Sequence, residues 1–216
     1  MPAWPILYIV SIYFAPGASN GWNRAVWFRA AAGCRQYLGM SRTVRLFVAA
    51  YPPADVARAL LMMLQECGLP AHRASRVEQV HMTLQFIGDT RLSDVDEVGE
   101  SMARSASGVG HLEVLPRRII SLPDRGPARL VAAETDCPPL LLELHRRLAR
   151  RLARRPGEHE GFLPHMTLAR FSAPVKGLKV VSPVRLPSFI FADVRLMQSD
   201  LGPSEAVHRL VRAVVL

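Results

Sequence analysis

The chain has 216 residues, a formal net charge of +9 and a sequence pI of about 10.4. Half of its residues are hydrophobic and 21% are charged, which excludes a disordered or low-complexity chain and fits one domain or two small lobes sharing a core. The basic charge favours polyanionic partners such as nucleic acids or phosphate esters. The three cysteines form no CxxC pair, and their odd number argues against a disulfide scaffold, so we expect no structural zinc and a protein of the reducing cytoplasm.

The first 42 residues differ in composition from the rest of the chain. They contain all three tryptophans but no Asp, Glu or Lys. Their apolar run, Trp4 to Phe14, is shorter than the roughly 20 residues that a membrane helix needs, and no basic residue precedes it as in a secretory signal. An N-terminal extension, a targeting peptide and untranslated sequence ahead of Met40 all remain open. We favour the last and expect residues 1–42 to lie outside the fold, 43–216 to form the domain, and no membrane association.

Beyond this segment, strand and helix patterns alternate. The predicted elements are a strand at 44–50, a helix from 53 to about 67, a strand at 79–87 with a turn at Gly88-Asp89, a helix from 93 to about 105 with a capping box of Ser93 and Asp96, strands at 111–120 and 129–134, a helix from 138 to 155, and strands at 165–171, 188–197 and 207–215. This order is typical of an α+β fold with hairpins. Neither GxGxxG nor GxxxxGK[ST] follows a strand, so dinucleotide or P-loop binding is not indicated.

The longest predicted helix combines an apolar stripe with many basic residues. The stripe consists of Leu141, Leu144, Leu148 and Leu152, and the arginines are Arg146, Arg147, Arg150, Arg151, Arg154 and Arg155. We interpret the arginine-rich faces as a solvated surface, with RNA binding as the alternative. His145 lies in this helix and is predicted to be solvated.

Two segments of the chain begin with the same four residues, HMTL, at 81–84 and at 165–168. Alternate side chains of a strand point to opposite faces, so the His and Thr of each segment share one face and the Met and Leu share the other. The same alternation places Gln85 on the polar face and Phe86 in the core. Two such strands from related halves would bring two imidazoles and two hydroxyls around one small volume.

This set of side chains suits the cleavage of a phosphodiester. Breaking a P–O bond needs a base and an acid, and imidazole titrates near neutral pH. The hydroxyls can donate hydrogen bonds to non-bridging phosphate oxygens, and no metal is required. A single HxT on a strand is usually structural, so the argument depends on the repeat. The other histidines, His72, His111, His145, His159 and His208, show no comparable context.

The motifs and their surroundings resemble the two-histidine (2H) phosphoesterase superfamily, and within it the RNA 2′,3′-cyclic phosphodiesterases, or 2′-5′ RNA ligase-like proteins. The similarity covers nearly all of Val44 to Leu216 and includes RLFVAAYPP at 45–53, both HMTL segments, PHMTLAR at 164–170 and SDLGP at 199–203. It implies a bilobal α+β fold with pseudo-two-fold symmetry. Antiparallel sheets would carry helices on the outside, and a central cleft would carry two HxTx motifs.

The resemblance also implies an activity, the metal-independent hydrolysis of an RNA-terminal 2′,3′-cyclic phosphate to a 2′-phosphate without a cofactor. By position, His81 would be the proton donor, His165 would be the proton acceptor, and Thr83 and Thr167 would bind the phosphate. The expected substrates are RNA with such an end or a small cyclic nucleotide, bound by a monomer. Two alternatives are an RNA-end binding module with little catalysis and ATP-independent 2′-5′ RNA ligation.

The sequence departs from its relatives at two positions beside the motifs. Gln85 stands where relatives often carry Lys or Arg, and Leu163 stands where an Arg often precedes the Pro-His pair. Both departures are predicted to remove positive charge near the phosphate, which would weaken substrate binding or change the length of RNA that is bound.

Overall fold

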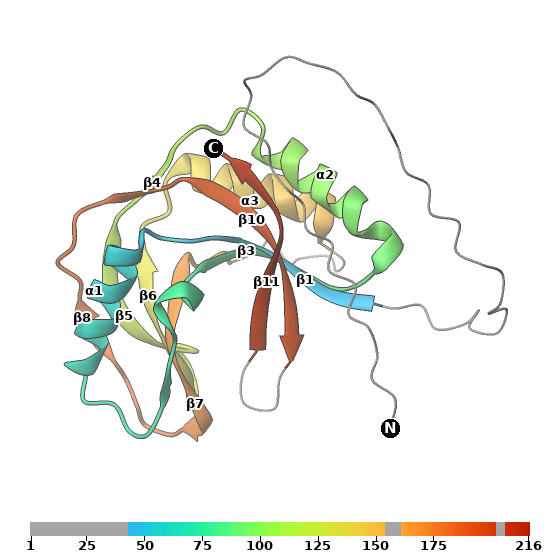
Figure 1. Ribbon diagram of the computed structural model, residues 1–216. Coiled ribbons are helices and arrows are strands. Elements are labelled where there is room, and N and C mark those ends of the chain that lie inside the picture. The colour runs from blue at the N-terminus through green and yellow to red at the C-terminus, as the bar shows by residue number, and fades with distance from the viewer. Residues whose placement is uncertain (1–42, 154–160, 202–205) are drawn as a thin grey trace, which may run out of the picture. The chain divides into compact units, whose positions relative to one another are not determined.

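The computed structural model describes residues 43–153, 161–201 and 206–216 (Figure 1). The predictions for residues 1–42, including a start at Met40, and for the end of the last helix beyond Ala153 lie outside these residues. Of the helices in the described part, none is long and apolar enough to cross a membrane.

Most strands join one antiparallel sheet in the order β11-β10-β1-β3-β7-β6-β5-β8, with β2 added beside β7. Its strands are β1 (Thr43–Ala50), β2 (Arg73–Ala74), β3 (Met82–Arg91), β5 (Pro116–Leu122), β6 (Ala128–Thr135), β7 (His165–Val175), β8 (Val181–Pro183), β10 (Asp193–Leu201) and β11 (Ala206–Val215). A separate pair consists of β4 (Leu112–Val114) and β9 (Phe189–Phe191), so the strand predicted at 111–120 is in fact two strands in different sheets. The predicted α+β class is confirmed.

The eight strands of this order form two halves of four, with β2 added to the second half, and β3 and β7 meet at the centre. A single register pair joins these two strands, Met82 with Met166. Each of these methionines is the second residue of an HMTL segment. The pseudo-two-fold axis expected from the repeat therefore passes through this pair. We call the Met82–Met166 pair the methionine seam.

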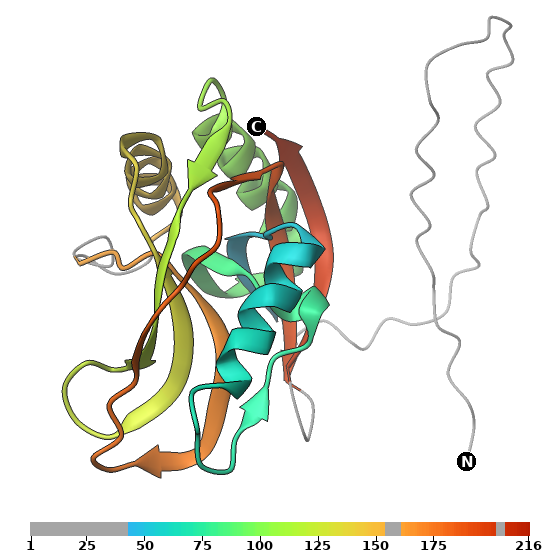
Figure 2. The same cartoon turned by 90° about the vertical axis from the view of Figure 1, so that its left-hand side faces the viewer.

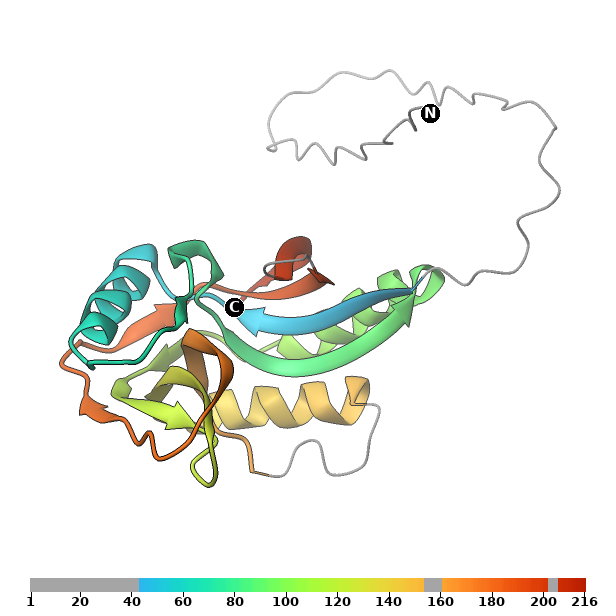
Figure 3. The ribbon, with the colours of Figure 1, turned by 90° about the horizontal axis from the view of Figure 1, so that it is seen from below.

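Three helices cover the halves of the sheet: α1 (Ala54–Gln65), α2 (Val95–Ala106) and α3 (Pro139–Leu152). Helices α2 and α3 lie side by side and pack on the strands of the first half, with α3 running along β3 (Figures 1 and 3). Helix α1 packs on the second half through contacts with β7 (Figure 2). The capping box predicted for α2 is wrong, because the Ser93 hydroxyl donates to the Asp94 carboxylate and no side chain caps the helix.

The apolar residues of both HMTL segments anchor them in the core. Met82, Leu84, Met166 and Leu168 are all buried. Two short stretches that carry polar side chains on one face are thus fixed by methionine and leucine on the other. The predicted alternation is confirmed for the HMTL residues themselves.

A β-bulge interrupts β3 directly after HMTL. Thr83 and Gln85 pair with adjacent residues of β1, so the register skips Leu84. One extra residue reverses the face on which the following side chains lie. Gln85 is consequently 4% exposed and Phe86 is 69% exposed. The prediction that Gln85 is on the polar face and Phe86 is in the core is therefore wrong.

Strand β7 has the same bulge in the same place. Thr167 and Ala169 pair with adjacent residues of β6, and Leu168 is skipped. Ala169 is buried while Arg170 is exposed. In both halves, the bulge brings the fifth residue after the histidine, Phe86 or Arg170, to the face that carries the His and Thr.

A buried histidine satisfies the backbone at the first bulge. His145 of α3 is only 4% exposed, so its predicted solvation is wrong. Its Nδ1 lies 2.7 Å from the Leu84 carbonyl oxygen, and its ring stacks on Phe162 at 4.0 Å between centroids. In the second half, the backbone N–H of Ser75 donates to the equivalent Leu168 carbonyl at 2.7 Å. Both skipped leucines thus keep a hydrogen-bonded carbonyl.

The chain does not turn at Gly88-Asp89 as predicted. Strand β3 continues to Arg91, and its pairing with β1 shifts a second time just before Gly88. Gly88 has a φ of 79°, which is a left-handed conformation that suits glycine at a bulge. The predicted turn is therefore a bend within a long strand.

Candidate active site

A cavity of about 860 Å³ lies over the methionine seam and is lined by residues of both halves. Three of the four predicted site residues, His81, Thr83 and Thr167, line it. His165 does not belong to the lining, but its charge acts on His81. The structure therefore gathers three of the four predicted residues around one volume, while His165 lies outside its lining.

The register of the methionine seam determines how the two motifs face each other. In an antiparallel pair centred on Met82 and Met166, the residue before one methionine lies beside the residue after the other. His81 is therefore the cross-strand neighbour of Thr167, and His165 is the neighbour of Thr83. Each imidazole is accompanied by a hydroxyl from the opposite motif.

Both motif histidines are oriented by the same local hydrogen bond. The Nδ1 of His81 lies 2.6 Å from the Gln79 carbonyl oxygen, and the Nδ1 of His165 lies 2.8 Å from that of Leu163. In each case the acceptor is two residues upstream. A carbonyl can only accept, so the neutral rings carry their proton on Nδ1 and leave a lone pair on Nε2.

His81 is enclosed by other rings. Its ring centroid lies 5.3 Å from Phe47, 5.4 Å from Tyr51 and 5.2 Å from His208. Burial raises the pKa of Tyr51 to about 12, although the Arg195 guanidinium, 4.8 Å from the Tyr51 ring centroid, acts in the opposite sense. The phenol therefore stays neutral and provides an uncharged wall.

This enclosure changes the acidity of His81. Burial lowers its pKa to about 4, and the hydrogen bond to the Gln79 carbonyl opposes this only in part. Protonation of His208, the charge of Arg170 and protonation of His165 would each act in the same direction as burial. In the unliganded protein, His81 is thus neutral at neutral pH.

Most of the residues that line the cavity were not predicted from the sequence as site residues, and three of them are close to the motifs in space. Phe86 and Arg170 reach it because of the two bulges, and His208 reaches it from β11. The prediction that His208 lacks a comparable context is wrong. The sequence predicts a strand around His208 from its alternation, but this alternation does not indicate which cavity the strand borders.

The cavity is positively charged. Arg45, Arg73 and Arg170 line it, and the one acidic residue of the described lining, Asp89, pairs with Arg45 at 3.5 Å. Arg73 and Arg170 are register partners, and burial together with the Arg73 charge lowers the pKa of Arg170. Two like charges held side by side favour an anion between them.

The predicted loss of positive charge at Gln85 and Leu163 does not describe this cavity. Gln85 is buried and does not line it, and Leu163 borders a different hollow. Leu163 contributes to the site through its backbone carbonyl, which accepts a hydrogen bond from His165. The cations come instead from β1, β2 and β7.

The described residues contain no group of three or more His, Cys, Asp or Glu side chains placed to hold a metal ion.

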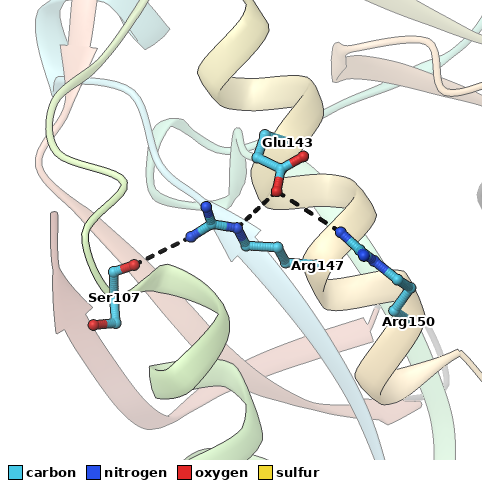
Figure 4. A network of polar contacts seen from close by, with 4 residues as sticks. All are labelled: Ser107, Glu143, Arg147 and Arg150. Atoms are coloured by element: carbon cyan, nitrogen blue, oxygen red, sulfur yellow. Dashed lines mark hydrogen bonds and ion pairs between the residues drawn. The ribbon is translucent and has the colours of Figure 1, made fainter.

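The arginine-rich helix α3 uses part of its charge within the molecule. Arg147 donates to Glu143 at 2.9 Å and to the Ser107 carbonyl, beyond the end of α2, at 3.2 Å (Figure 4). Arg150 lies 3.7 Å from the same Glu143 carboxylate. These contacts give two of the arginines a structural role on the outer surface, which favours the solvated-face interpretation over RNA binding.

A family model described as the 2′-5′ RNA ligase superfamily matches residues 52–202. The chain belongs to this superfamily. The match includes both HMTL segments and confirms the resemblance to the two-histidine phosphoesterases.

Several solved structures share the fold of the chain. TT0787 of Thermus thermophilus is 24% identical with a TM-score of 0.66, over 80% of this chain and 97% of that one. E. coli LigT in complex with 3′-AMP is 20% identical with a TM-score of 0.68, over 81% and 99%. E. coli LigT in complex with phosphate is 21% identical with a TM-score of 0.67, over 82% and 99%. Among curated proteins, none matches the chain significantly.

Proposed function

We propose that this member of the superfamily hydrolyses an RNA-terminal 2′,3′-cyclic phosphate to a 2′-phosphate without a metal ion. The observation that carries the proposal is the methionine seam. In its register a histidine of each HMTL segment neighbours a threonine of the other, and His81 and both threonines line a cavity that three arginines also line. Acid, base and hydrogen-bond donors for a phosphate are thereby available from two equivalent strands.

In the proposed reaction, a water oxygen attacks phosphorus and the bond from phosphorus to the 3′ oxygen breaks. His165 accepts the proton of the water at Nε2, and His81 donates a proton to the departing 3′ oxygen. Thr83 and Thr167 donate hydrogen bonds to the non-bridging oxygens. The net change is the addition of one water across the P–O bond. Proton exchange with solvent then returns both imidazoles to their starting protonation states.

The surroundings of His81 bear on its role as the donor. A donor must be protonated, whereas the pKa of this group is about 4 in the unliganded protein. A bound phosphate anion stabilises the imidazolium and therefore raises that pKa. Substrate binding thus favours protonation of His81, which then donates this proton in the reaction.

Two further observations support a nucleotide as the substrate. Phe86 presents an exposed ring to the cavity, 6.5 Å from Phe47, and a nucleobase can stack on such a surface. Arg170, at the equivalent position of the other half, supplies a guanidinium suited to phosphate. E. coli LigT has been crystallised with 3′-AMP and with phosphate, which agrees with a nucleotide phosphate as the ligand class.

The test is turnover of a nucleoside 2′,3′-cyclic phosphate in EDTA by the wild-type chain, His81→Asn and His165→Asn. Each substitution is expected to lower kcat by about 10²- to 10⁴-fold, the usual contribution of a general acid or base. His111→Asn, an exposed histidine outside the cavity, is the matched control. Wild-type rates in both motif variants, or complete inhibition by EDTA, would overturn the proposal.

The same experiment separates the two alternatives. RNA binding without any turnover would select an RNA-end binding module, and a 2′-5′ linked product without ATP would select ligation, which uses the same groups in reverse. Action as a monomer in the cytoplasm remains part of the proposal, and sedimentation of the purified chain tests the monomer.

A further inference from the structure

A third imidazole lies in the cleft, and the proposed reaction gives it no task. His208 of β11 lines the cavity. Its ring is T-shaped to that of His81, with centroids 5.2 Å apart, and edge-on to that of Phe47 at 4.9 Å. Across the ladder its register partner is Ser199 of β10, which also lines the cavity.

The two ring nitrogens of His208 have different surroundings. Nδ1 is shut off from solvent and has no hydrogen-bond partner within the described part of the chain. Nε2 is not shut off in this way, and the ring to which it belongs lines the cavity. In His81 and His165, by contrast, Nδ1 donates to a backbone carbonyl.

The surroundings of Nδ1 determine where the proton of the neutral ring resides. A buried N–H without an acceptor loses its hydrogen bond to water and gains nothing in return. The neutral tautomer of His208 therefore carries its proton on Nε2. The motif histidines have the opposite tautomer, so the cleft contains two imidazoles with a free lone pair and one with a free N–H.

We propose that His208 is a substrate-binding residue that donates its Nε2–H to a non-bridging phosphate oxygen while the ring is neutral. This inference rests on the proposed function and deepens it by assigning the phosphate a third donor from the C-terminal strand, beside Thr83 and Thr167. It also separates the tasks of neighbouring imidazoles, since His81 exchanges a proton with the substrate and His208 does not.

The groups around His208 oppose its protonation. Protonating the ring would place an N–H on the buried Nδ1, beside His81 of the motif and near the charge of Arg170. Burial and the Arg170 charge accordingly lower its pKa. From β1 it faces the apolar ring of Phe47. A neutral donor is the role that remains compatible with all of these neighbours.

The kinetic test compares His208→Phe with His208→Gln. Phenylalanine keeps a ring against His81 and Phe47 but removes the donor, whereas the glutamine amide restores an N–H near the position of Nε2. We expect kcat/KM for the cyclic phosphate to fall about 10- to 100-fold in His208→Phe, mainly through KM, as for one lost hydrogen bond to a charged group. His208→Gln should be at least about tenfold better than His208→Phe.

Two kinetic outcomes would overturn the inference: wild-type kcat/KM in His208→Phe, or equal impairment of both variants. His111→Phe serves as the control for a histidine-to-phenylalanine change outside the cavity.

A second measurement needs neither turnover nor a variant. Ring ¹⁵N chemical shifts of the full chain distinguish the tautomers, and we expect Nε2–H in His208 and Nδ1–H in His81 and His165. Addition of inorganic phosphate should shift the Nε2–H signal of His208. An Nδ1–H tautomer, or no response to saturating phosphate, would contradict the inference. If the wild-type chain fails to hydrolyse the cyclic phosphate, the proposed function fails, while this measurement still decides the tautomer and the phosphate contact.

Discussion

At the scale of single residues, His81 combines a position suited to catalysis with surroundings that oppose its charge. Rings of Phe47, Tyr51 and His208 surround it, and the Gln79 carbonyl fixes its orientation. Apolar contact favours the neutral imidazole, and the lowered pKa follows from this burial. A bound anion acts in the opposite direction, because it stabilises the imidazolium that donates the proton to the leaving group.

The pH profile of turnover tests this relation. A donor is active when protonated, so activity falls as pH rises through its pKa. Because kcat/KM reports the unliganded protein and kcat reports the complex, the alkaline limb due to His81 is expected at least about one pH unit higher in kcat than in kcat/KM. Steady-state kinetics from about pH 4 to 9 measure both limbs. Coincident limbs, or a limb that persists in His81→Asn, would contradict the assignment.

At the scale of elements, the paired bulges decide which side chains reach the cavity. The motif strands alternate as simple strands as far as Leu84 and Leu168, and then one skipped residue exchanges the faces. Without the first bulge, Phe86 would be in the core and Gln85 in the cavity. Helix α3 stabilises this arrangement from outside the sheet, since His145 donates to the Leu84 carbonyl.

Removal of that contact is expected to destabilise the fold. His145→Leu introduces an apolar side chain of similar size and leaves the Leu84 carbonyl without its donor, so the free energy of unfolding should fall by about 1–3 kcal/mol. Arg146→Leu, on the exposed side of the same turn, should change it by less than about 0.5 kcal/mol. Urea denaturation of both variants measures the difference, and equal stabilities would show that the hydrogen bond contributes nothing.

The bulges also explain where prediction from the sequence succeeded and failed. The motif histidines, their threonines and the apolar anchors follow from a period of two over four residues. Gln85 and Phe86 were misplaced because a bulge depends on the partner strand, which local alternation does not contain. His208 was missed because its place beside His81 is fixed by the pairing of β11 with β10, far from either motif. His145 was misplaced because the six arginines around it suggested a solvated face.

At the scale of the whole molecule, the two halves of the large sheet depend on the methionine seam. Met82 is fully buried, and its pairing with Met166 is the one register pair between β3 and β7. The candidate site therefore lies where the half formed by β11, β10, β1 and β3 meets the half formed by β7, β6, β5 and β8. Packing at the seam is expected to affect both stability and the placement of the motifs.

Truncation of a methionine of the seam should accordingly lower the free energy of unfolding. Met82→Ala removes a fully buried side chain, and the free energy of unfolding is expected to fall by about 2–5 kcal/mol. Met62→Ala is the matched control, because Met62 is 68% exposed and its loss should cost less than about 0.5 kcal/mol. Chemical denaturation gives both values. Indistinguishable midpoints for the two variants would mean that the seam does not stabilise the sheet.

The pseudo-two-fold axis through Met82 and Met166 also has a stereochemical consequence. Groups related by such an axis lie on opposite sides of any atom placed on it. A phosphorus atom held on the axis at the level of the two imidazoles would have one imidazole on the side of the incoming oxygen and the other on the side of the departing one, as an in-line displacement requires. Such a displacement inverts the configuration at phosphorus. A thiophosphate substrate that is chiral at phosphorus should therefore give a product of inverted configuration.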